Sequence, residues 1–275
     1  GTSLTKTGTG TATLSNTNTY SGDTNINGGT LSVSASANLG NAANTLFIND
    51  TGNLLVTSTF STARNITLGG YASITTDAAN LTASGVVSGS ATLLKYGSGI
   101  LSFSNSGNTY GHASNGGTVI HQGTFQITNA AAAGSQNIVI GSATFNPEVA
   151  GTVANAVVVN QSSSIISTTS TPTLSGIVSG TGILNKEGSG TLALSNTNTY
   201  SGGTNINAGI IEAQASAALG TGAATVNSGT SLIVNGNGLN IANQLTLIGT
   251  GASSIGALVQ YANNNTVSGA IILGS

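Results

Sequence analysis

The chain of 275 residues contains no cysteine, methionine or tryptophan and only two prolines. Without cysteine it can form neither a disulfide framework nor a thiolate metal site. Charged residues make up 4% of the chain, and the formal net charge is −2. Its 4 basic residues are too few to neutralise a nucleic-acid backbone or to hold an anionic membrane surface. We therefore expect no nucleic-acid partner.

Long apolar runs are also missing from the chain. No stretch approaches the roughly 18 consecutive apolar residues of a membrane-spanning helix, and the first residues do not resemble a signal peptide. We therefore expect no membrane insertion by this segment, and we interpret it as an excerpt from a longer polypeptide.

The residues that are abundant favour strands and tight turns. Thr, Val and Ile favour strands, whereas Asn, Ser and the 40 glycines favour turns. Helix-forming Glu, Lys, Gln and Arg are scarce. Disorder normally accompanies low hydrophobicity and high net charge, and here 38% of residues are hydrophobic. The composition predicts an all-β protein with many short strands.

An internal repeat organises the sequence. LSNTNTYSG occurs at 14–22 and again at 194–202, and the longer stretches 6–33, 95–127 and 186–213 align with one another. The middle copy is the most diverged, with extra residues between Tyr110 and Thr118. The repeat predicts three units of about 91 residues, at 1–92, 93–183 and 184–275.

Alternating apolar residues place one side of each predicted strand inward. Ile26, Ile120 and Ile206 align at one inward position, flanked by Asn27, His121 and Asn207 outside. A single strand of this length cannot bury its own face, but stacked coils of roughly 20–25 residues can. We predict a single continuous parallel β-helix (β-solenoid) over 1–275, right-handed, with about twelve coils and Asn ladders along its turns. A propeller or an antiparallel sandwich is the alternative.

The motif resembles the autotransporter-associated β-strand repeat, also called the passenger-associated transport repeat. The match is closest in KEGSGTLALSNTNTYSGGTNINAGII at 186–211. The resemblance implies a β-helical passenger region exported by type V secretion, on the cell surface or outside a Gram-negative bacterium. It implies an outer-membrane translocation barrel of the same polypeptide as partner. It carries no catalytic residue.

The polar residues do not assemble into a recognisable catalytic or metal site. The six acids are Asp23, Asp50, Asp77, Glu148, Glu187 and Glu212. We expect them at solvated turns, although a converged carboxylate pair of a β-helix hydrolase stays open. His112 and His121 lie close in sequence without further ligands nearby, so we predict exposed side chains. We expect no enzyme activity, metal or cofactor.

Two residue types recur once in every unit, and we expect both at the surface. Lys6, Lys95 and Lys186 would stand along one edge, four coils apart, and keep a turn soluble or bind an acidic partner. Tyr20, Tyr110 and Tyr200 would pack over the coil edge or form an exposed row that binds glycans.

The loop 111–117 is the candidate recognition site, with Gly111, His112, Ser114 and Asn115 as its residues. The sequence as a whole predicts a structural, surface-exposed stalk that is adhesive and aids its own translocation. One alternative is a segment of an extracellular filament that self-associates end to end or laterally. The other is a polysaccharide-binding or polysaccharide-active β-helix.

Overall fold

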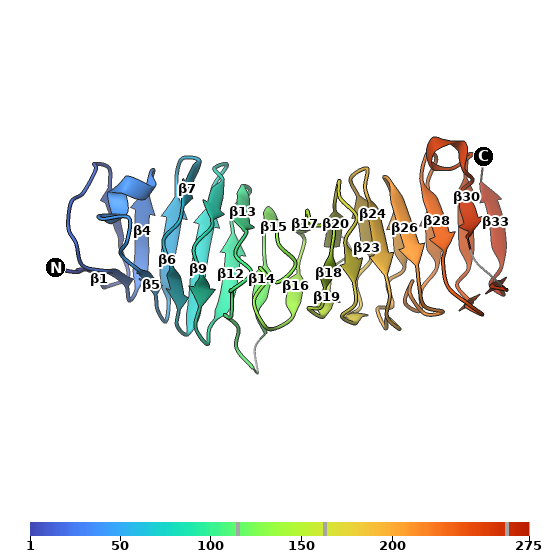
Figure 1. Cartoon of the computed structure of the whole chain (residues 1–275), viewed down its shortest axis with the longest axis horizontal. Helices are drawn as coiled ribbons and strands as arrows, with labels where there is room; N and C mark the ends of the chain where they lie inside the picture. The colour runs from blue at the N-terminus through green and yellow to red at the C-terminus, as the bar shows by residue number, and fades with distance from the viewer. Residues whose placement is uncertain (114–115, 162–163, 262–263, 275) are drawn as a thin grey trace. The chain divides into compact units, whose positions relative to one another are not determined.

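The chain folds into short parallel strands wound into a solenoid. The computed structural model describes residues 1–113, 116–161, 164–261 and 264–274. It forms two compact units, Gly1–Val139 and Ile140–Ser275, and in each the strands stack side by side (Figure 1). About 11 turns of parallel β-solenoid are present and 3% of the chain is helical. The prediction of an all-β parallel solenoid is confirmed.

The first unit has three parallel sheets, whose neighbours along each sheet come from successive coils. The first sheet runs β1 (Leu4–Lys6), β3 (Thr24–Ile26), β5 (Leu46–Ile48), β8 (Ile66–Leu68) and β11 (Val87–Ser88). The second runs β2 (Thr11–Leu14), β4 (Gly29–Val33), β6 (Gly52–Val56), β9 (Tyr71–Thr76), β12 (Thr92–Tyr96) and β14 (Thr118–Ile120). The third runs β7 (Phe60–Thr62), β10 (Leu81–Ala83), β13 (Ile100–Phe103) and β15 (Thr124–Ile127). A short 3-10 helix, η1 (Ser36–Leu39), forms one corner, and β16 (Ile138–Ile140) lies at the end of the unit.

The second unit is built in the same way. One sheet runs β17 (Thr144–Pro147), β20 (Ser164–Ser167), β23 (Leu184–Glu187), β25 (Thr204–Ile206), β27 (Ala224–Val226), β30 (Leu245–Ile248) and β33 (Ile271–Gly274). Another runs β18 (Thr152–Val153), β21 (Thr173–Leu174), β24 (Thr191–Leu194), β26 (Ile210–Ala213), β28 (Ser231–Val234) and β31 (Leu258–Gln260). Two shorter pairs are β19 (Val157–Val159) with β22 (Val178–Ser179), and β29 (Asn240–Ile241) with β32 (Thr266–Val267). The 3-10 helix η2 covers Ala252–Ser254.

The strand register gives the length of a coil directly. Ala12 pairs with Leu31, 19 positions later, and Leu93 pairs with Thr118, 25 positions later. The longest steps in the described part of the chain are 26 positions, as from Leu232 to Leu258 and from Leu245 to Ile271. This range fits the coil length that the repeat predicts, because each extra residue is absorbed in a turn between strands.

The repeat is longer than a whole number of coils. Lys6 lies on β1 in the first sheet of the first unit, whereas Lys95 lies on β12 in the second sheet. From β1 to β11 the chain completes four coils along the first sheet. It then enters β12 in the second sheet, so one repeat spans four coils and about a third of a turn. The expectation of lysines aligned along one edge is therefore wrong, because the motif moves to the next side of the coil.

Inward and outward positions follow the predicted alternation. Ile26, Ile120 and Ile206 are fully buried, whereas Asn27, His121 and Asn207 beside them are exposed. The predicted Asn ladders are also present. The Asn49 amide donates to Asn27 at 2.9 Å, and the Asn227 amide donates to Asn207 at 2.8 Å. Such ladders satisfy the amides of one coil with those of the next.

None of the helical segments in the described part of the chain has the length and apolarity needed to span a membrane.

The middle repeat has an aromatic core cluster, from which a first prediction follows. The Phe103 ring meets Phe125 edge to face, with centroids 5.4 Å apart, and Tyr110 at 5.8 Å. Leu14 and Leu194 stand at the Phe103 position in the other repeats. We expect Phe103→Ala to lower the free energy of unfolding by about 3–5 kcal/mol, because it leaves a cavity.

The matched control is Phe103→Leu, which installs the residue of the other two repeats. It should cost under about 1.5 kcal/mol, because the volume is largely kept. Urea unfolding followed by circular dichroism measures both variants. An equal loss of unfolding free energy in the two variants would contradict the expectation that the core accepts leucine at position 103.

Candidate functional site: the repeated corner

Each repeat begins with a lysine whose ammonium group holds two coils together. Lys186 Nζ donates to the carbonyl oxygens of Glu187 and Gly188, both at 2.7 Å, within its own turn. It also donates to the Ala208 carbonyl in the next coil, at 3.1 Å. An ammonium group has three N–H donors, so this arrangement uses all of them.

The other two lysines make the same three contacts. Lys95 Nζ donates to the carbonyls of Tyr96, Gly97 and Gln122, at 2.7, 2.8 and 3.2 Å. Lys6 Nζ donates to those of Thr7, Gly8 and Gly28, at 2.7, 2.9 and 2.9 Å. The lysine is thus a cross-link between the K-x-G turn and the turn stacked on it.

Burial distinguishes the three lysines. Lys95 and Lys186 are 0% exposed, whereas Lys6 is half-buried. Burial lowers the pKa of Lys95 and of Lys186 to about 8, although nearby acidic side chains, Asp77 and Glu187 respectively, partly offset the effect. Both therefore remain protonated at neutral pH. The prediction of surface lysines is wrong for these two, because the buried turn carbonyls need donors that no water supplies.

A glycine opposite the lysine completes this corner. Gly209 has a φ of +66°, in the left-handed region that favours glycine. A Cβ at this position would collide with the carbonyl oxygens of Gly188 and Gly190 in the coil below. The spacing of Lys and Gly in the motif therefore follows from the close approach of two turns.

A buried asparagine two residues before the tyrosine joins three coils. The Asn198 side-chain oxygen accepts from the Val178 N–H at 2.8 Å, and its amide donates to the Ala218 carbonyl at 2.7 Å. Asn108 makes the same pair of bonds to Val87 and Ala132, both at 2.8 Å. Sequence reasoning missed this residue. The signal was its presence before each tyrosine, as Asn18, Asn108 and Asn198, despite the insertions in the middle copy.

The repeated tyrosines point inward. Tyr110 and Tyr200 are fully buried, and Tyr20 is half-buried. Each hydroxyl shares a hydrogen bond with a threonine hydroxyl: Thr24 at 2.6 Å, Thr118 at 2.8 Å and Thr204 at 2.6 Å. Burial raises the pKa of the Tyr110 and Tyr200 phenols well above the usual range.

Each ring also lies against a glycine of the next coil, such as Gly220 beside Tyr200. The expectation of surface positions is thus wrong for Tyr110 and Tyr200, and the alternative of an exposed tyrosine row is wrong with it. An exposed row would leave the large apolar rings in water, whereas the next coil covers them.

The predicted recognition loop is described only in part. Gly111 and His112 are half-buried, and Ser114 and Asn115 lie outside the described residues. The backbones of His112 and Gly116 exchange two hydrogen bonds, of 3.0 and 2.9 Å, in an antiparallel bridge. His121 is exposed as expected and stacks on Tyr96 with centroids 4.5 Å apart. A recognition role for this loop stays a prediction.

Several carboxylates bind neighbouring polar groups of the solenoid. Asp23 accepts from the Thr45 N–H at 2.9 Å, Glu187 from the Asn207 amide at 2.8 Å, and Glu212 from the Asn235 amide at 2.8 Å. Burial alone would raise the pKa of Glu148, but hydrogen bonds from Thr169 and Ser170 in the next coil outweigh it and lower that pKa. Over the described ranges, no group of three His, Asp or Glu side chains could hold a metal ion.

The fold and the repeated corner define a class of protein: a repeat-built β-solenoid whose recurring residues join its coils. The family model described as passenger-associated transport repeat matches residues 4–33, 93–127 and 184–213. The chain is also similar to a protein named adhesin BmaC autotransporter, from Brucella suis biovar 1 (strain 1330). The two are 35% identical over 236 residues, which cover 74% of this chain and 7% of that relative. The chain therefore contains three passenger-associated transport repeats, and its similarity to an autotransporter supports a passenger repeat region.

The chain spans only a small part of that relative's length, so the whole relative's properties are not carried over to it. No solved structure gives a significant match to the chain.

The lysine cross-link generates a second prediction. We expect Lys186→Met to lower the free energy of unfolding by about 2–3 kcal/mol, because it leaves buried carbonyls without donors. Lys6→Met removes the same three hydrogen bonds, but Lys6 is half-buried and water can replace it. It should cost under about 1 kcal/mol. Urea unfolding of both variants measures the difference, and an equal cost would contradict the role of burial.

Proposed function

We propose that the chain is a structural, surface-exposed stalk of a larger passenger, without enzymatic activity. The observation that carries this proposal is that the recurrent lysine, asparagine and tyrosine of the motif bind backbone or side-chain groups of the solenoid itself. Lys186, Asn198 and Tyr200 have their hydrogen-bonding groups directed into the solenoid. Side chains used in this way are not available to contact a substrate.

We propose further that the chain is one continuous solenoid on the outside of a Gram-negative bacterium, with a translocation barrel in the same polypeptide as partner. The similarity to an autotransporter supports this location. An adhesive role rests on the name of that relative, adhesin, and on no particular side chain of this chain.

The corner also supports a role in translocation. Lys186 needs the Ala208 carbonyl, 22 positions later, and Asn198 needs the Ala218 carbonyl, 20 positions later. These bonds form only when the following coil has docked, so each folded coil is a template for the next. In a chain that emerges unfolded from a pore, such stepwise folding opposes backward movement of the segment already outside.

Asn198→Leu in the full-length protein tests this role. The variant leaves the Val178 N–H and the Ala218 carbonyl without partners, and we expect slower appearance of the passenger at the cell surface. Pulse labelling with external protease digestion measures this rate. The control is Asn237→Leu, which changes an exposed asparagine and should leave the rate unchanged. Normal surface display of Asn198→Leu, together with reduced stability of the purified passenger, would contradict the translocation role. It would still agree with the proposal of a structural stalk.

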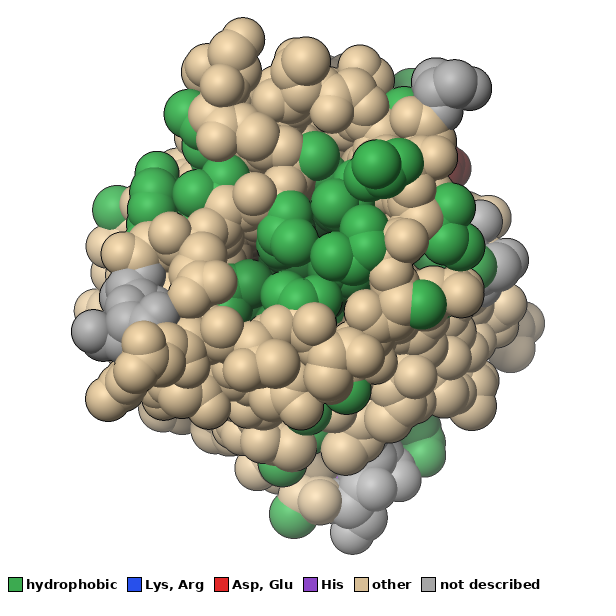
Figure 2. Space-filling model, turned by 90° about the vertical axis from the view of Figure 1, so that its right-hand side faces the viewer, with side chains coloured by type: hydrophobic (Ala, Val, Ile, Leu, Met, Phe, Trp, Pro, Cys, Tyr) green, Lys and Arg blue, Asp and Glu red, His purple; other side chains and the backbone are tan. Residues whose placement is uncertain are grey.

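The last described strand of the second unit, β33, has apolar side chains at its edge. Ile271, Ile272 and Leu273 are 48%, 46% and 80% exposed. Figure 2 shows hydrophobic side chains gathered at the centre of this end of the second unit. A further coil of a longer passenger would bury them as well as a second copy would, so this edge does not favour a filament over a stalk.

A further inference from the structure

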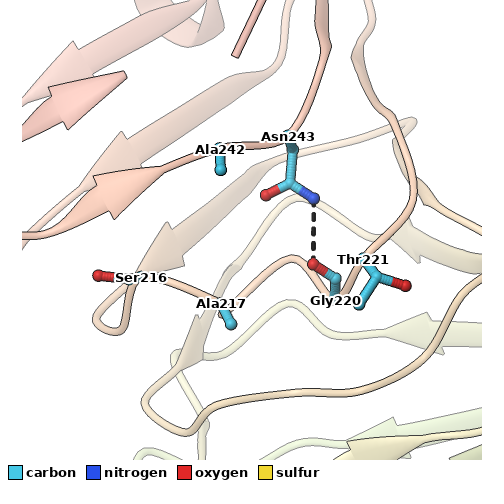
Figure 3. Close-up of a pocket in the computed structure, with 6 residues that line it drawn as sticks. All are labelled: Ser216, Ala217, Gly220, Thr221, Ala242 and Asn243. Atoms are coloured by element: carbon cyan, nitrogen blue, oxygen red, sulfur yellow. Dashed lines mark hydrogen bonds between the residues drawn. The ribbon is translucent and has the colours of Figure 1, made fainter. Parts of the chain in front are cut away.

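A groove in the second unit lies at a corner between two successive coils. It is lined by Ser216, Ala217, Gly220, Thr221, Ala242 and Asn243, and it encloses about 220 Å³ (Figure 3). Backbone groups and small side chains form its wall. The groove opens to solvent beside Ser216 and Thr221, which are both exposed.

The first unit has the same corner, but there an arginine occupies it. Ser36 and Gly40 stand 180 positions before Ser216 and Gly220, just after the aligned stretches, in the similar sequences ASANLG and ASAALG. The position that faces them in the next coil is held by Arg64 in the first unit and by Asn243 in the second. The strand register supports this equivalence: each residue lies two positions before a residue, Ile66 or Leu245, that pairs with the preceding coil.

The arginine head is held by three backbone carbonyls. One terminal nitrogen of Arg64 donates to Ser36 O at 3.1 Å and to Gly40 O at 2.6 Å, and the other donates to Asn41 O. The residue is 3% exposed. The corner is thus a carbonyl cradle whose spacing fits the planar, multi-donor guanidinium group.

The second unit keeps the cradle but lacks the arginine. The Asn243 amide donates to Gly220 O at 3.1 Å and to Gly222 O at 2.7 Å, near the wall of the groove (Figure 3). Its side chain is too short to reach further along the corner. Among the described residues, the carbonyls of Ser216 and Thr221 accept no backbone or side-chain hydrogen bond. These two carbonyls correspond to Ser36 and Asn41 in the first unit.

We propose that this groove binds a guanidinium group, presented by an arginine side chain of another polypeptide. The first unit holds that chemical group in the equivalent place with its own chain. Carbonyl oxygens that face one groove favour a cation, and several in one plane favour guanidinium over a compact ammonium ion. No cluster of His, Asp or Glu in the described ranges offers an alternative metal site.

Titration of the full chain with N-acetylarginine amide, followed by amide NMR, tests the proposal. We expect saturable shifts at Ser216, Thr221 and Asn243, and at least tenfold weaker binding of N-acetyllysine amide at the same ionic strength. Equal binding of the two compounds, or shifts spread over the whole surface, would overturn it. A tripeptide with a central arginine should bind as well as the amide. Failure of the tripeptide to bind would overturn the proposal that a polypeptide supplies the arginine.

Two reciprocal variants give matched controls. Asn243→Arg should fill the groove from within, abolish binding of the arginine amide and raise the melting temperature. Arg64→Asn should open the corresponding corner of the first unit and raise the number of sites from one to two. Unchanged binding to Asn243→Arg would overturn the assignment whether or not Arg64→Asn folds. Neither result bears on the stalk proposal, which depends on the lysine and asparagine contacts.

Discussion

The structure depends on the hydrogen bonding of backbone groups where the chain turns between strands. Along the strands, successive coils satisfy one another through the parallel ladders. At the turns the ladders stop, and carbonyls would be buried without donors, which is costly. Lys95 and Lys186 supply donors at one turn, and Asn108 and Asn198 supply a donor and an acceptor at another. Each of these side chains makes at least one hydrogen bond that joins two coils.

This constraint explains the composition of the repeat. A motif with one lysine, one buried asparagine and one tyrosine per repeat satisfies the backbone hydrogen-bonding groups of its corners with few charges. The chain accordingly has only 4% charged residues. Glycines such as Gly209 stand where two turns come too close for a side chain. The small and polar residues of the chain thus belong to its packing, which is why we assign the repeat a structural role.

The three repeats differ at positions that the lysine, asparagine and tyrosine contacts do not fix. The middle copy replaces core aliphatic residues with Phe103 and Phe125, and it places the stacked Tyr96 and His121 where the other copies have polar residues. In the coil beyond the repeated motif, Arg64 fills a carbonyl cradle and Asn243 leaves part of it open. The open corner of the second unit therefore lies outside the shared motif, whereas the loop 111–117 of the middle repeat lies within it.

The sequence by itself determined the solenoid, the coil length and the inward positions such as Ile26 and Ile206, because these follow from local alternation and from the repeat. It also contained the asparagine signal, although nothing in its local pattern showed what Asn198 contacts. Only the tertiary structure decided that Lys95, Lys186, Tyr110 and Tyr200 lie inside. Lysine and tyrosine at turns are ordinarily exposed at least in part, and their burial depends on groups about 20 residues away that stack on them. It likewise decided that the lysines occupy different sheets, because the repeat exceeds four coils by about a third of a turn.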